Sequence, residues 1–264
     1  MKFTKMHGLG NDYLYVYGEV PGNAAELSKK LSERHLGAGS DGMIYISTSN
    51  IADFKMRIFN ADGSEAKMCG NGIRCVGKFV YDKGYTDKKF ISIETLSGVK
   101  YLTLQIVGGK VKTITVDMGQ AQAEKAMNLT VDGETVSLFP VSVGNPHAVI
   151  FVDDIEKAPL TKLGPIIEHH EAFADGVNVE FVQVLGTDKL RMRVWERGSG
   201  VTMACGTGAC ASVMAAIAAK HCHYDETVSV VLDGGILKIK IAADNTIQMT
   251  GPAEIVYEGE TEIC

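Results

Sequence analysis

Features that mark several protein classes are missing from this 264-residue sequence. No apolar run approaches the roughly 20 residues that a membrane-spanning helix needs, and the first residues lack the apolar stretch of a signal peptide. The net charge is −6, whereas proteins that bind nucleic acids usually present a basic surface. We therefore expect a cytoplasmic protein that binds neither a membrane nor a nucleic acid.

Paired cysteines at the spacing of a structural zinc site are also missing, so no metal site is expected. In a reducing compartment the default state of a cysteine is the thiol. We expect Cys75, Cys210 and Cys222 to be small buried hydrophobic residues and Cys264 to be a surface thiol at the end of the chain. The six cysteines are Cys69, Cys75, Cys205, Cys210, Cys222 and Cys264.

What the sequence does contain is one pattern written twice. Residues 56–60 (MRIFN) lead to residues 68–72 (MCGNG), and residues 192–196 (MRVWE) lead to residues 204–208 (ACGTG). Every position of the first pair of segments matches the second pair at the same offset. A duplication with so long a period indicates two copies of one domain, each carrying one cysteine in a Cys-Gly-x-Gly turn.

The repeat extends over most of the chain, and its differences fall where loops are expected. Residues 10–12 (GND) are echoed by residues 144–146 (GNP), each followed by an apolar run. We expect one domain over residues 1–120, joined by an additional strand within residues 253–264, and a second domain over residues 121–252.

Hydrophobic periodicity predicts both helices and strands. Helices are expected at residues 71–81 and 207–219, directly after the Cys-Gly turns, and the second is apolar nearly all round, which is typical of a helix buried on all sides. A third helix, with a polar face, is expected at residues 24–35. We infer an α/β fold of the α+β kind, with two pseudo-symmetric domains that each wrap a mixed β-sheet or barrel around a central helix. Alternating strand patterns occur at residues 54–58, 190–194 and 237–241.

The two Cys-Gly turns suggest chemistry because Cys69 and Cys205 each precede a helix start. There, backbone N–H groups and the helix dipole favour negative charge, which should lower the pKa of a thiol and also hold a carboxylate. Two such turns facing each other across an interdomain cleft would place two thiol bases around one carbon. This arrangement suits the removal of a proton from one face of a carbon and its return to the other face.

Seven segments around these turns carry a family resemblance. They are residues 6–12 (MHGLGND), 59–65 (FNADGSE), 68–72 (MCGNG), 144–147 (GNPH), 177–181 (VNVEF), 195–198 (WERG) and 204–208 (ACGTG). Together they resemble the diaminopimelate epimerases. The resemblance implies pyridoxal-independent interconversion of LL- and meso-diaminopimelate, for lysine and peptidoglycan synthesis, by a two-domain enzyme that closes on its small amino-acid substrate. A homodimer is compatible with the sequence.

The resemblance also implies a role for each site residue. Cys69 and Cys205 would be the two acid/base thiols, and His147 and Glu196 would activate them. The backbone at the start of each helix would hold the reacting carboxylate, at Gly70, Asn71, Gly206 and Thr207. The amino groups and the distant carboxylate of the substrate would be bound by Asn11, Asn60, Asn145, Asn178 and Arg197. One departure is Tyr13, where the family usually has phenylalanine.

Two alternatives stay open from the residues alone. The first is an epimerase or racemase of the same fold that acts on another amino acid, although Arg197 and the asparagines favour a substrate with a second charged end. The second is a non-catalytic amino-acid-binding protein, which the two thiols together with His147 and Glu196 disfavour. No lysine lies in a recognisable pyridoxal context, so no cofactor is expected.

Overall fold

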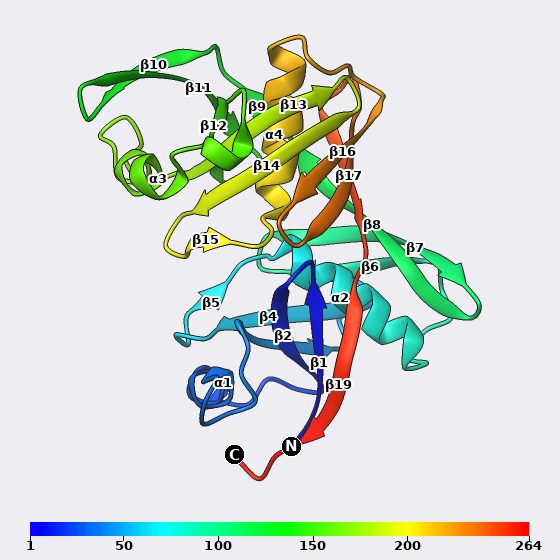
Figure 1. Ribbon diagram of the computed structural model, residues 1–264. Helices are drawn as coiled ribbons and strands as arrows, with labels where there is room; N and C mark the ends of the chain where they lie inside the picture. Colours follow the sequence, from blue (N-terminus) through cyan, green and yellow to red (C-terminus); the bar gives the residue numbers. More distant parts are fainter. Residues whose placement is uncertain (264) are drawn as a thin grey trace. The chain divides into compact units, whose positions relative to one another are not determined.

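The computed structural model describes residues 1–263 and places them in two compact units (Figure 1). Unit 1 comprises residues 1–116 together with the C-terminal residues from Gly251 onward, and unit 2 comprises residues 117–250. Both are built mainly from β-strands with few helices. No helix among the described residues has both the length and the apolar character that crossing a membrane requires.

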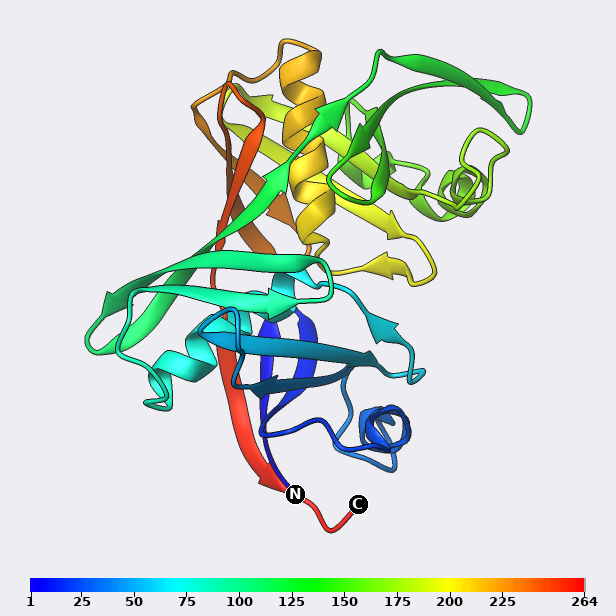
Figure 2. The same cartoon turned by 180° about the vertical axis from the view of Figure 1, so that it is seen from behind.

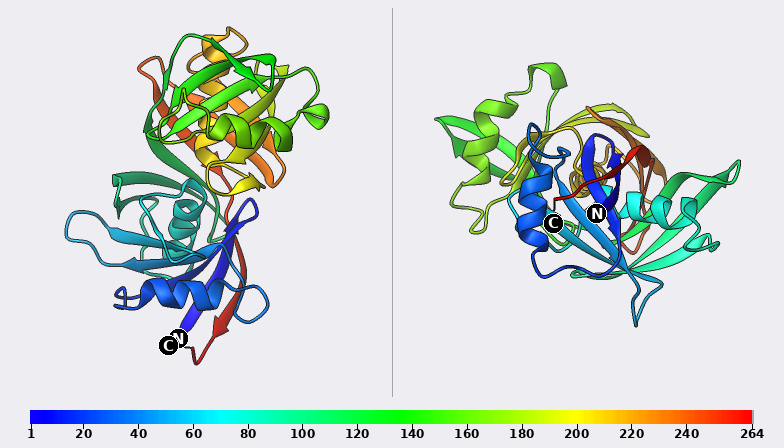
Figure 3. Two further views of the ribbon diagram at one scale, coloured as in Figure 1. Left: turned by 90° about the vertical axis from the view of Figure 1, so that its left-hand side faces the viewer. Right: turned by 90° about the horizontal axis from the view of Figure 1, so that it is seen from below.

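Unit 1 begins and ends with paired strands. The C-terminal β19 (Glu254–Glu260) runs antiparallel to β1, as the extra strand expected at the end of the chain, and the two lie side by side in both views of Figure 3. The other elements are β1 (Lys2–Gly8), β2 (Asn11–Tyr17), α1 (Ala24–Ser32), β3 (Gly42–Ser47), β4 (Phe54–Asn60), β5 (Glu65–Ala66), α2 (Gly70–Asp82), β6 (Phe90–Thr95), β7 (Gly98–Val107) and β8 (Lys110–Gln120), which runs on into unit 2.

Unit 2 contains a second set of strands and two α-helices. Its elements are β9 (Gln122–Ala123), β10 (Met127–Val131), β11 (Glu134–Ser142), β12 (Pro146–Phe151), the 3-10 helix η1 (Ile155–Lys157), α3 (Leu160–Glu168), β13 (Asn178–Gly186), β14 (Lys189–Glu196), β15 (Gly200–Thr202), α4 (Gly206–Ala218), β16 (Thr227–Leu232), β17 (Gly235–Ile241) and β18 (Thr246–Gly251).

The two units repeat one strand topology. In unit 1, β1–β2 is antiparallel, β2–β3 parallel, β3–β4 antiparallel, β4–β6 parallel, and β6–β7 and β7–β8 antiparallel. Unit 2 repeats this order of pairings from β11 to β18. The short strands β5 and β15, and the helices α2 and α4, follow at the same points. The duplicated fold inferred from the sequence is confirmed.

One helix occupies the centre of each unit. Figure 2 shows α4 standing among the strands of unit 2, and the helix packs against β11, β12, β13, β14, β16 and β17. Every residue from 208 to 217 is buried, as expected for a helix without a polar face. In unit 1, α2 packs against β1, β2 and β7. These central helices matter for function because each begins directly after one of the two cysteines singled out by the sequence.

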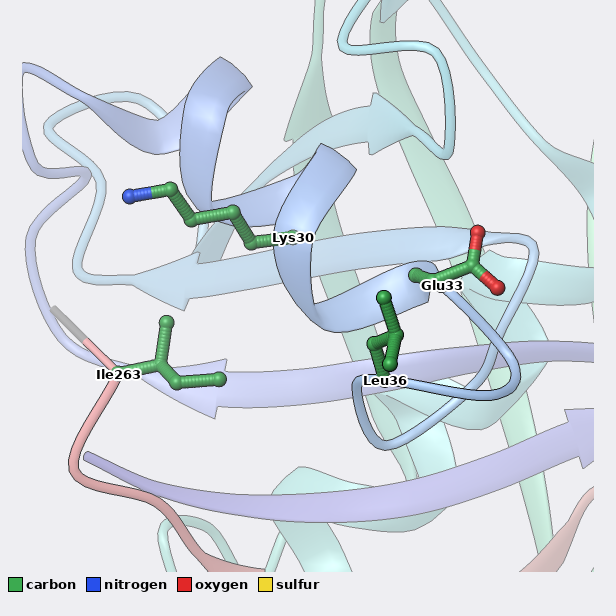
Figure 4. A pocket seen from close by; sticks show the side chains of 4 residues that line it. All are labelled: Lys30, Glu33, Leu36 and Ile263. Carbon is green, nitrogen blue, oxygen red and sulfur yellow. The ribbon is translucent and has the colours of Figure 1, made fainter.

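The expected helix at residues 24–35 is shorter than predicted. The helix α1 ends at Ser32, and the backbone leaves the helical region at Glu33 (φ −57°, ψ 121°). Leu31 is the last buried leucine of its inner face, so a further turn has no apolar side chain to bury. Arg34 instead turns to an ion pair with Asp41. Beside this helix lies an open pocket that contains no predicted site residue, lined by Lys30, Glu33, Leu36 and Ile263 (Figure 4).

Candidate active site

Cys69 occupies the N-cap of α2, with extended backbone angles (φ −138°, ψ 115°). Its Sγ accepts a hydrogen bond from the Gly72 N–H at 3.3 Å, in the manner of an N-cap side chain. The thiol also donates to Asn11 Oδ1 at 3.4 Å. The structure thus brings together Cys69 and Asn11, which are 58 residues apart in sequence.

A charged cluster fixes the orientation of the Asn11 amide. Its Nδ2 donates to Asp41 Oδ2 at 2.8 Å, which leaves Oδ1 facing the thiol. Arg34 bridges Asp41 and Asp12, and Lys5 pairs with Asp12 at 2.9 Å. Burial acts to raise the pKa of Asp12, but hydrogen bonds from Lys5 and Arg34 hold that pKa below its usual value. Asp12 therefore stays ionised, and the hydrogen bond to Asp41 holds the Asn11 amide in one orientation.

The other predicted unit 1 residues bond within their own segments. Asn71 is buried, and its Oδ1 accepts a hydrogen bond from the fully buried guanidinium of Arg74 at 2.9 Å. The same guanidinium donates to the Gly70 carbonyl at 3.0 Å. Asn60 Nδ2 donates to Ser64 Oγ at 3.1 Å, inside the turn after β4. Gly70 and Asn71 thus lie beside Cys69 in the first turn of α2, whereas the Asn60 side chain is tied to its own turn.

Cys205 occupies the matching N-cap of α4, again with extended backbone angles (φ −115°, ψ 113°). Its Sγ accepts a hydrogen bond from the Gly208 N–H at 3.3 Å and lies 3.5 Å from Thr207 Oγ1. Thr207 in turn accepts a hydrogen bond from Asn145 Nδ2 at 3.4 Å. Cys205, Thr207 and Asn145, all predicted from the sequence, therefore form one connected group with Gly206 at the same helix start.

His147 is buried within this group and contacts two side chains. Its Nδ1 lies 2.7 Å from Glu180 Oε1, and its Nε2 lies 3.1 Å from Asn145 Oδ1. The side chains of His147 and Glu180 are both 0% exposed. A histidine held on both ring nitrogens has a fixed ring orientation, which suits a residue that must handle protons.

Glu196, at the end of β14, is a second carboxyl close to Cys205. Its Oε2 accepts a hydrogen bond from the Thr202 hydroxyl at 2.7 Å. Burial raises the pKa of Glu196, and the negative charge of Glu180 adds to the effect. A carboxyl with a raised pKa is suited to exchanging protons near neutral pH.

The expectation that the helix start lowers the pKa of the thiol is wrong for Cys205. Burial raises the pKa of this thiol well above its usual value, and the charges of Glu196 and Glu180 raise it further. The hydrogen bonds from Thr207 and the Gly208 N–H act in the opposite direction but are the smaller effects. Desolvation and two neighbouring carboxylates outweigh the helix dipole here, so Cys205 is held as a thiol.

Asn178 and Arg197 lie side by side in unit 2. Asn178 Oδ1 accepts a hydrogen bond from the Arg197 backbone N–H at 3.0 Å, and its Nδ2 donates to the Pro146 carbonyl at 2.9 Å. Arg197 is exposed, and its guanidinium donates to the carbonyl of Asp175 at 2.8 Å. The Asn178 side chain thus ties the segment that carries Arg197 to the segment that carries His147.

Several residues of this environment were not predicted from the sequence. Glu180 lies between Val179 and Phe181, in a strand of mostly apolar residues. A charged residue in such a strand is the only feature of the sequence that could have indicated its place in the site. Glu168 is 5% exposed and accepts hydrogen bonds from Trp195 Nε1 at 2.6 Å and from the Gly198 N–H at 2.8 Å. It thereby holds both ends of the turn that carries Arg197, although nothing in the sequence links it to that turn.

Gly208 and its repeat counterpart Gly72 offer a matched pair of substitutions. An added Cβ on Gly208 would lie 2.6 Å from Glu180 Oε1, whereas one on Gly72 would lie 2.7 Å from Ile44 Cδ1. The isoleucine methyl can move, but the carboxylate is held by His147. We expect Gly208→Ala to lower the free energy of unfolding by about 2 kcal/mol more than Gly72→Ala, the size of a core overpacking penalty. Urea unfolding of both variants measures this, and equal losses would contradict it.

The raised pKa of Glu196 predicts a pH-dependent cost to stability. Because the folded state binds this proton more tightly than the unfolded state, the cost is absent below the usual carboxyl pKa and develops as pH rises through the raised one. Glu196→Gln, which can still accept the Thr202 hydrogen bond, should therefore raise the free energy of unfolding at neutral pH. Denaturant titrations across pH check this, and the gain should vanish in acid.

Comparison with known proteins places this chain in a family. A family model described as diaminopimelate epimerase matches residues 3–124 and 139–256. A protein named diaminopimelate epimerase from Methanococcus maripaludis is 50% identical over 278 residues, covering 100% of both chains. One of the same name from Bacteroides thetaiotaomicron is 51% identical over 265 residues, covering 99% of this chain and 98% of its own.

Solved structures with much lower identity share the fold. A phenazine biosynthesis protein of the PhzF family from Bacillus anthracis is 16% identical with a TM-score of 0.79, covering 100% of this chain and 99% of its own. A hydroxyproline epimerase from Agrobacterium vitis is 15% identical with a TM-score of 0.74, covering 99% of this chain and 90% of its own. The full-length relatives at about half identity, together with the matching family model, show that the chain belongs to the diaminopimelate epimerase family.

Proposed function

We propose that this protein interconverts LL- and meso-diaminopimelate by a two-thiol mechanism without pyridoxal, as a step of lysine and peptidoglycan synthesis. The observation that carries the proposal is that each repeat presents one cysteine at the N-cap of its central helix, with its Sγ 3.3 Å from a first-turn N–H. Membership of the diaminopimelate epimerase family supports the choice of substrate.

In this proposal the two thiols act on opposite faces of the α-carbon. Cys205, whose pKa is raised by burial and by Glu196 and Glu180, begins as the thiol and donates a proton. Cys69 acts as the thiolate, after losing the proton that its thiol donates to Asn11 Oδ1, and removes the α-proton. After one turnover the protonation states are exchanged, so the same site processes the other stereoisomer in reverse. Two bases that interact in this way titrate as a pair.

Stabilisation of the carbanion is assigned to the helix starts. The α-proton of an amino acid is far less acidic than a thiol, so fixed dipoles must stabilise the developing charge. Backbone N–H groups at Gly70, Asn71, Gly206 and Thr207 would hold the reacting carboxylate. Asn11, Asn60, Asn145 and Asn178 would bind or frame the amino groups, and Arg197 would bind the distant carboxylate. Exclusion of water then strengthens each of these contacts.

Solvent isotope exchange tests this function directly. LL-diaminopimelate incubated with the protein in deuterium oxide should acquire deuterium at one α-carbon and yield the meso form, as followed by mass spectrometry and chiral separation. Lysine, which lacks the second carboxylate, is the matched control and should exchange far more slowly. Exchange with another amino acid but not with diaminopimelate would indicate an epimerase of different specificity, and binding without exchange would indicate a binding protein.

We also propose that the protein is a homodimer located in the cytoplasm. Ile255, Val256 and Tyr257 of β19 are exposed, at 36%, 53% and 41%. They present apolar side chains on both faces of the strand, and apolar side chains left exposed in this way favour an interface with a second copy. Catalytic thiols must also stay reduced, as they do in the cytosol. Sedimentation should give twice the chain mass, and Val256→Lys should shift the protein toward monomer; a wild-type monomer would contradict the proposal.

A further inference from the structure

Glu168 is a buried carboxylate in an electrostatically unfavourable place. It is the last residue of α3 and is 5% exposed. The C-terminal end of a helix carries partial negative charge that repels an anion, and burial of a charge adds a second cost in free energy. Burial acts to raise the pKa of Glu168, but hydrogen bonds from Trp195 and from the Gly198 N–H hold that pKa below its usual value. A charge kept in such a place needs an explanation.

The two oxygens of this carboxylate bind both sides of one turn. Oε2 accepts a hydrogen bond from Trp195 Nε1 at 2.6 Å, and Oε1 accepts one from the Gly198 N–H at 2.8 Å. The donors belong to the residue two positions before Arg197 and to the residue directly after it. Glu168 therefore restrains the turn on either side of Arg197.

The helix that carries Glu168 also packs against the indole ring. An added Cβ on Gly164 would lie 2.6 Å from both Cβ and Cγ of Trp195, so the side chain of Trp195 lies directly on the helix backbone. Gly164 and Glu168 are four residues apart and share one face of α3. This face thus contacts the indole at one helical turn and accepts its N–H at the next.

The side chain of Arg197 is anchored to the loop that follows α3. Its Nη1 donates to the Asp175 carbonyl at 2.8 Å, and an added Cβ on Gly176 would lie 3.1 Å from Arg197 Cδ. The same loop is tied back to the helix, because the Val177 N–H donates to the Glu168 carbonyl at 3.2 Å. The acceptors recorded for the guanidinium are neutral carbonyls, so its positive charge remains available to a ligand.

We propose that Glu168 is a positioning residue for substrate specificity, which holds the turn of residues 195–198 so that Arg197 meets the distant carboxylate of the substrate. The inference rests on the proposed function and deepens it by assigning the residue that places Arg197. A guanidinium binds a carboxylate through two parallel hydrogen bonds only over a narrow range of orientations. A small displacement of the turn therefore weakens the contact.

The first repeat contains a weaker form of the same restraint. In unit 1 the helix at the matching point is α1, and its Ser28 Oγ lies 2.8 Å from the carbonyl oxygens of both Phe59 and Asn60. A serine hydroxyl has one proton to donate, whereas a carboxylate accepts from two N–H groups at once. The stronger restraint thus occurs at the turn that carries Arg197, the residue assigned to a charged group of the substrate.

Steady-state kinetics of Glu168→Gln test the proposal. Glutamine keeps the shape of the side chain but replaces one accepting oxygen by an NH2 group. The variant should raise KM for diaminopimelate about tenfold, the effect of losing one hydrogen bond to a charged group. The kcat should stay within about threefold, because Arg197 does not contact the reacting carbon. The kcat/KM for lysine should be unchanged, since lysine has no second carboxylate.

The matched control is Asp82→Asn in unit 1. The Asp82 side chain is 3% exposed, accepts a hydrogen bond from the Val111 N–H at 2.9 Å and pairs with Lys78 at 2.9 Å. The control therefore also removes a buried carboxylate that holds a backbone N–H. It should lower stability in urea as Glu168→Gln does, yet leave KM for diaminopimelate unchanged. An equal rise in KM for both variants would overturn the proposal.

A double variant and the sign of the effect separate positioning from a simple effect of charge. If Glu168 acts through Arg197, then Glu168→Gln combined with Arg197→Met should show the KM of Arg197→Met alone. Removal of a negative charge without any movement of the turn would lower KM, because the carboxylate of the substrate would be repelled less. A lower or unchanged KM in Glu168→Gln, or multiplicative effects in the double variant, would overturn the proposal.

Fluorescence follows the turn without requiring turnover, because Trp195 is the only tryptophan of the chain. In Glu168→Gln its emission should shift to longer wavelength and be quenched more strongly by acrylamide, whereas Asp82→Asn should match the wild type. A wild-type protein that does not epimerise diaminopimelate refutes the proposed function. Quenching then decides the restraint alone: stronger quenching in Glu168→Gln supports it, and equal quenching refutes it. If Glu168→Gln does not fold, Trp195→Phe removes the same hydrogen bond from its other end and should raise KM with kcat retained.

Discussion

Replacing either Cys69 or Cys205 by alanine is expected to lower epimerisation by at least about a thousandfold, because each removes one of two proton-transfer groups. The fold should survive. Both side chains cap their helices through an N–H···S contact at 3.3 Å, and loss of such a cap costs about 1 kcal/mol. Chiral separation of products measures the rate, and urea unfolding measures stability.

The remaining thiol in each variant gives the prediction a second readout. A β-halogenated analogue of the substrate loses its halide after removal of a single proton, so one of the two variants should still eliminate it from a given stereoisomer. Cys75→Ala, a buried cysteine six residues after Cys69, is the matched control and should retain epimerase activity. Near-normal epimerisation by either active-site variant would refute the two-base mechanism.

Arg197→Met is expected to raise KM for diaminopimelate by roughly a hundredfold, since a charge-assisted, bidentate contact with a carboxylate is worth about 1.5–3 kcal/mol. Stability should change little, because the guanidinium is exposed and donates to the carbonyls of Asp175 and Gly176. Steady-state kinetics with diaminopimelate and with lysine check the result. The ratio of kcat/KM for diaminopimelate to kcat/KM for lysine should fall.

The matched control for Arg197 is Arg193→Met. Arg193 lies in β14, the strand that leads to Arg197, and its Nε pairs with Asp233 at 3.2 Å, so the substitution removes the same charge from a different partner. Arg193→Met should leave KM for diaminopimelate within a factor of about two or three of the wild-type value, as expected for the loss of one partly exposed ion pair. An equal rise in KM for both variants would show a general effect of charge and would contradict a specific carboxylate contact at Arg197.

The sequence by itself determined the duplicated fold and the two cysteines. The Cys-Gly turns, the apolar helix after Cys205 and the alternating strands are local patterns, and local patterns reflect backbone preferences that act within a few residues. The duplication is visible because the same pattern recurs at the same offset in the two halves of the chain. The end of α1 was less well predicted. Arg34 forms an ion pair with Asp41 in place of a further helical turn, and local backbone preference does not encode that pairing.

Only the tertiary structure decided which side chains meet. The Asn11 oxygen faces Cys69 because Asp41 holds the other end of the amide, and the pKa of Cys205 rises because β13 and β14 bring carboxyls to a buried helix start. These contacts join residues that lie far apart in sequence and depend on strand register, since a shift by one residue would turn Glu180 to the opposite face of its sheet. Burial and charge at the site are therefore products of packing, whereas the positions of the two thiols could be read from the chain alone.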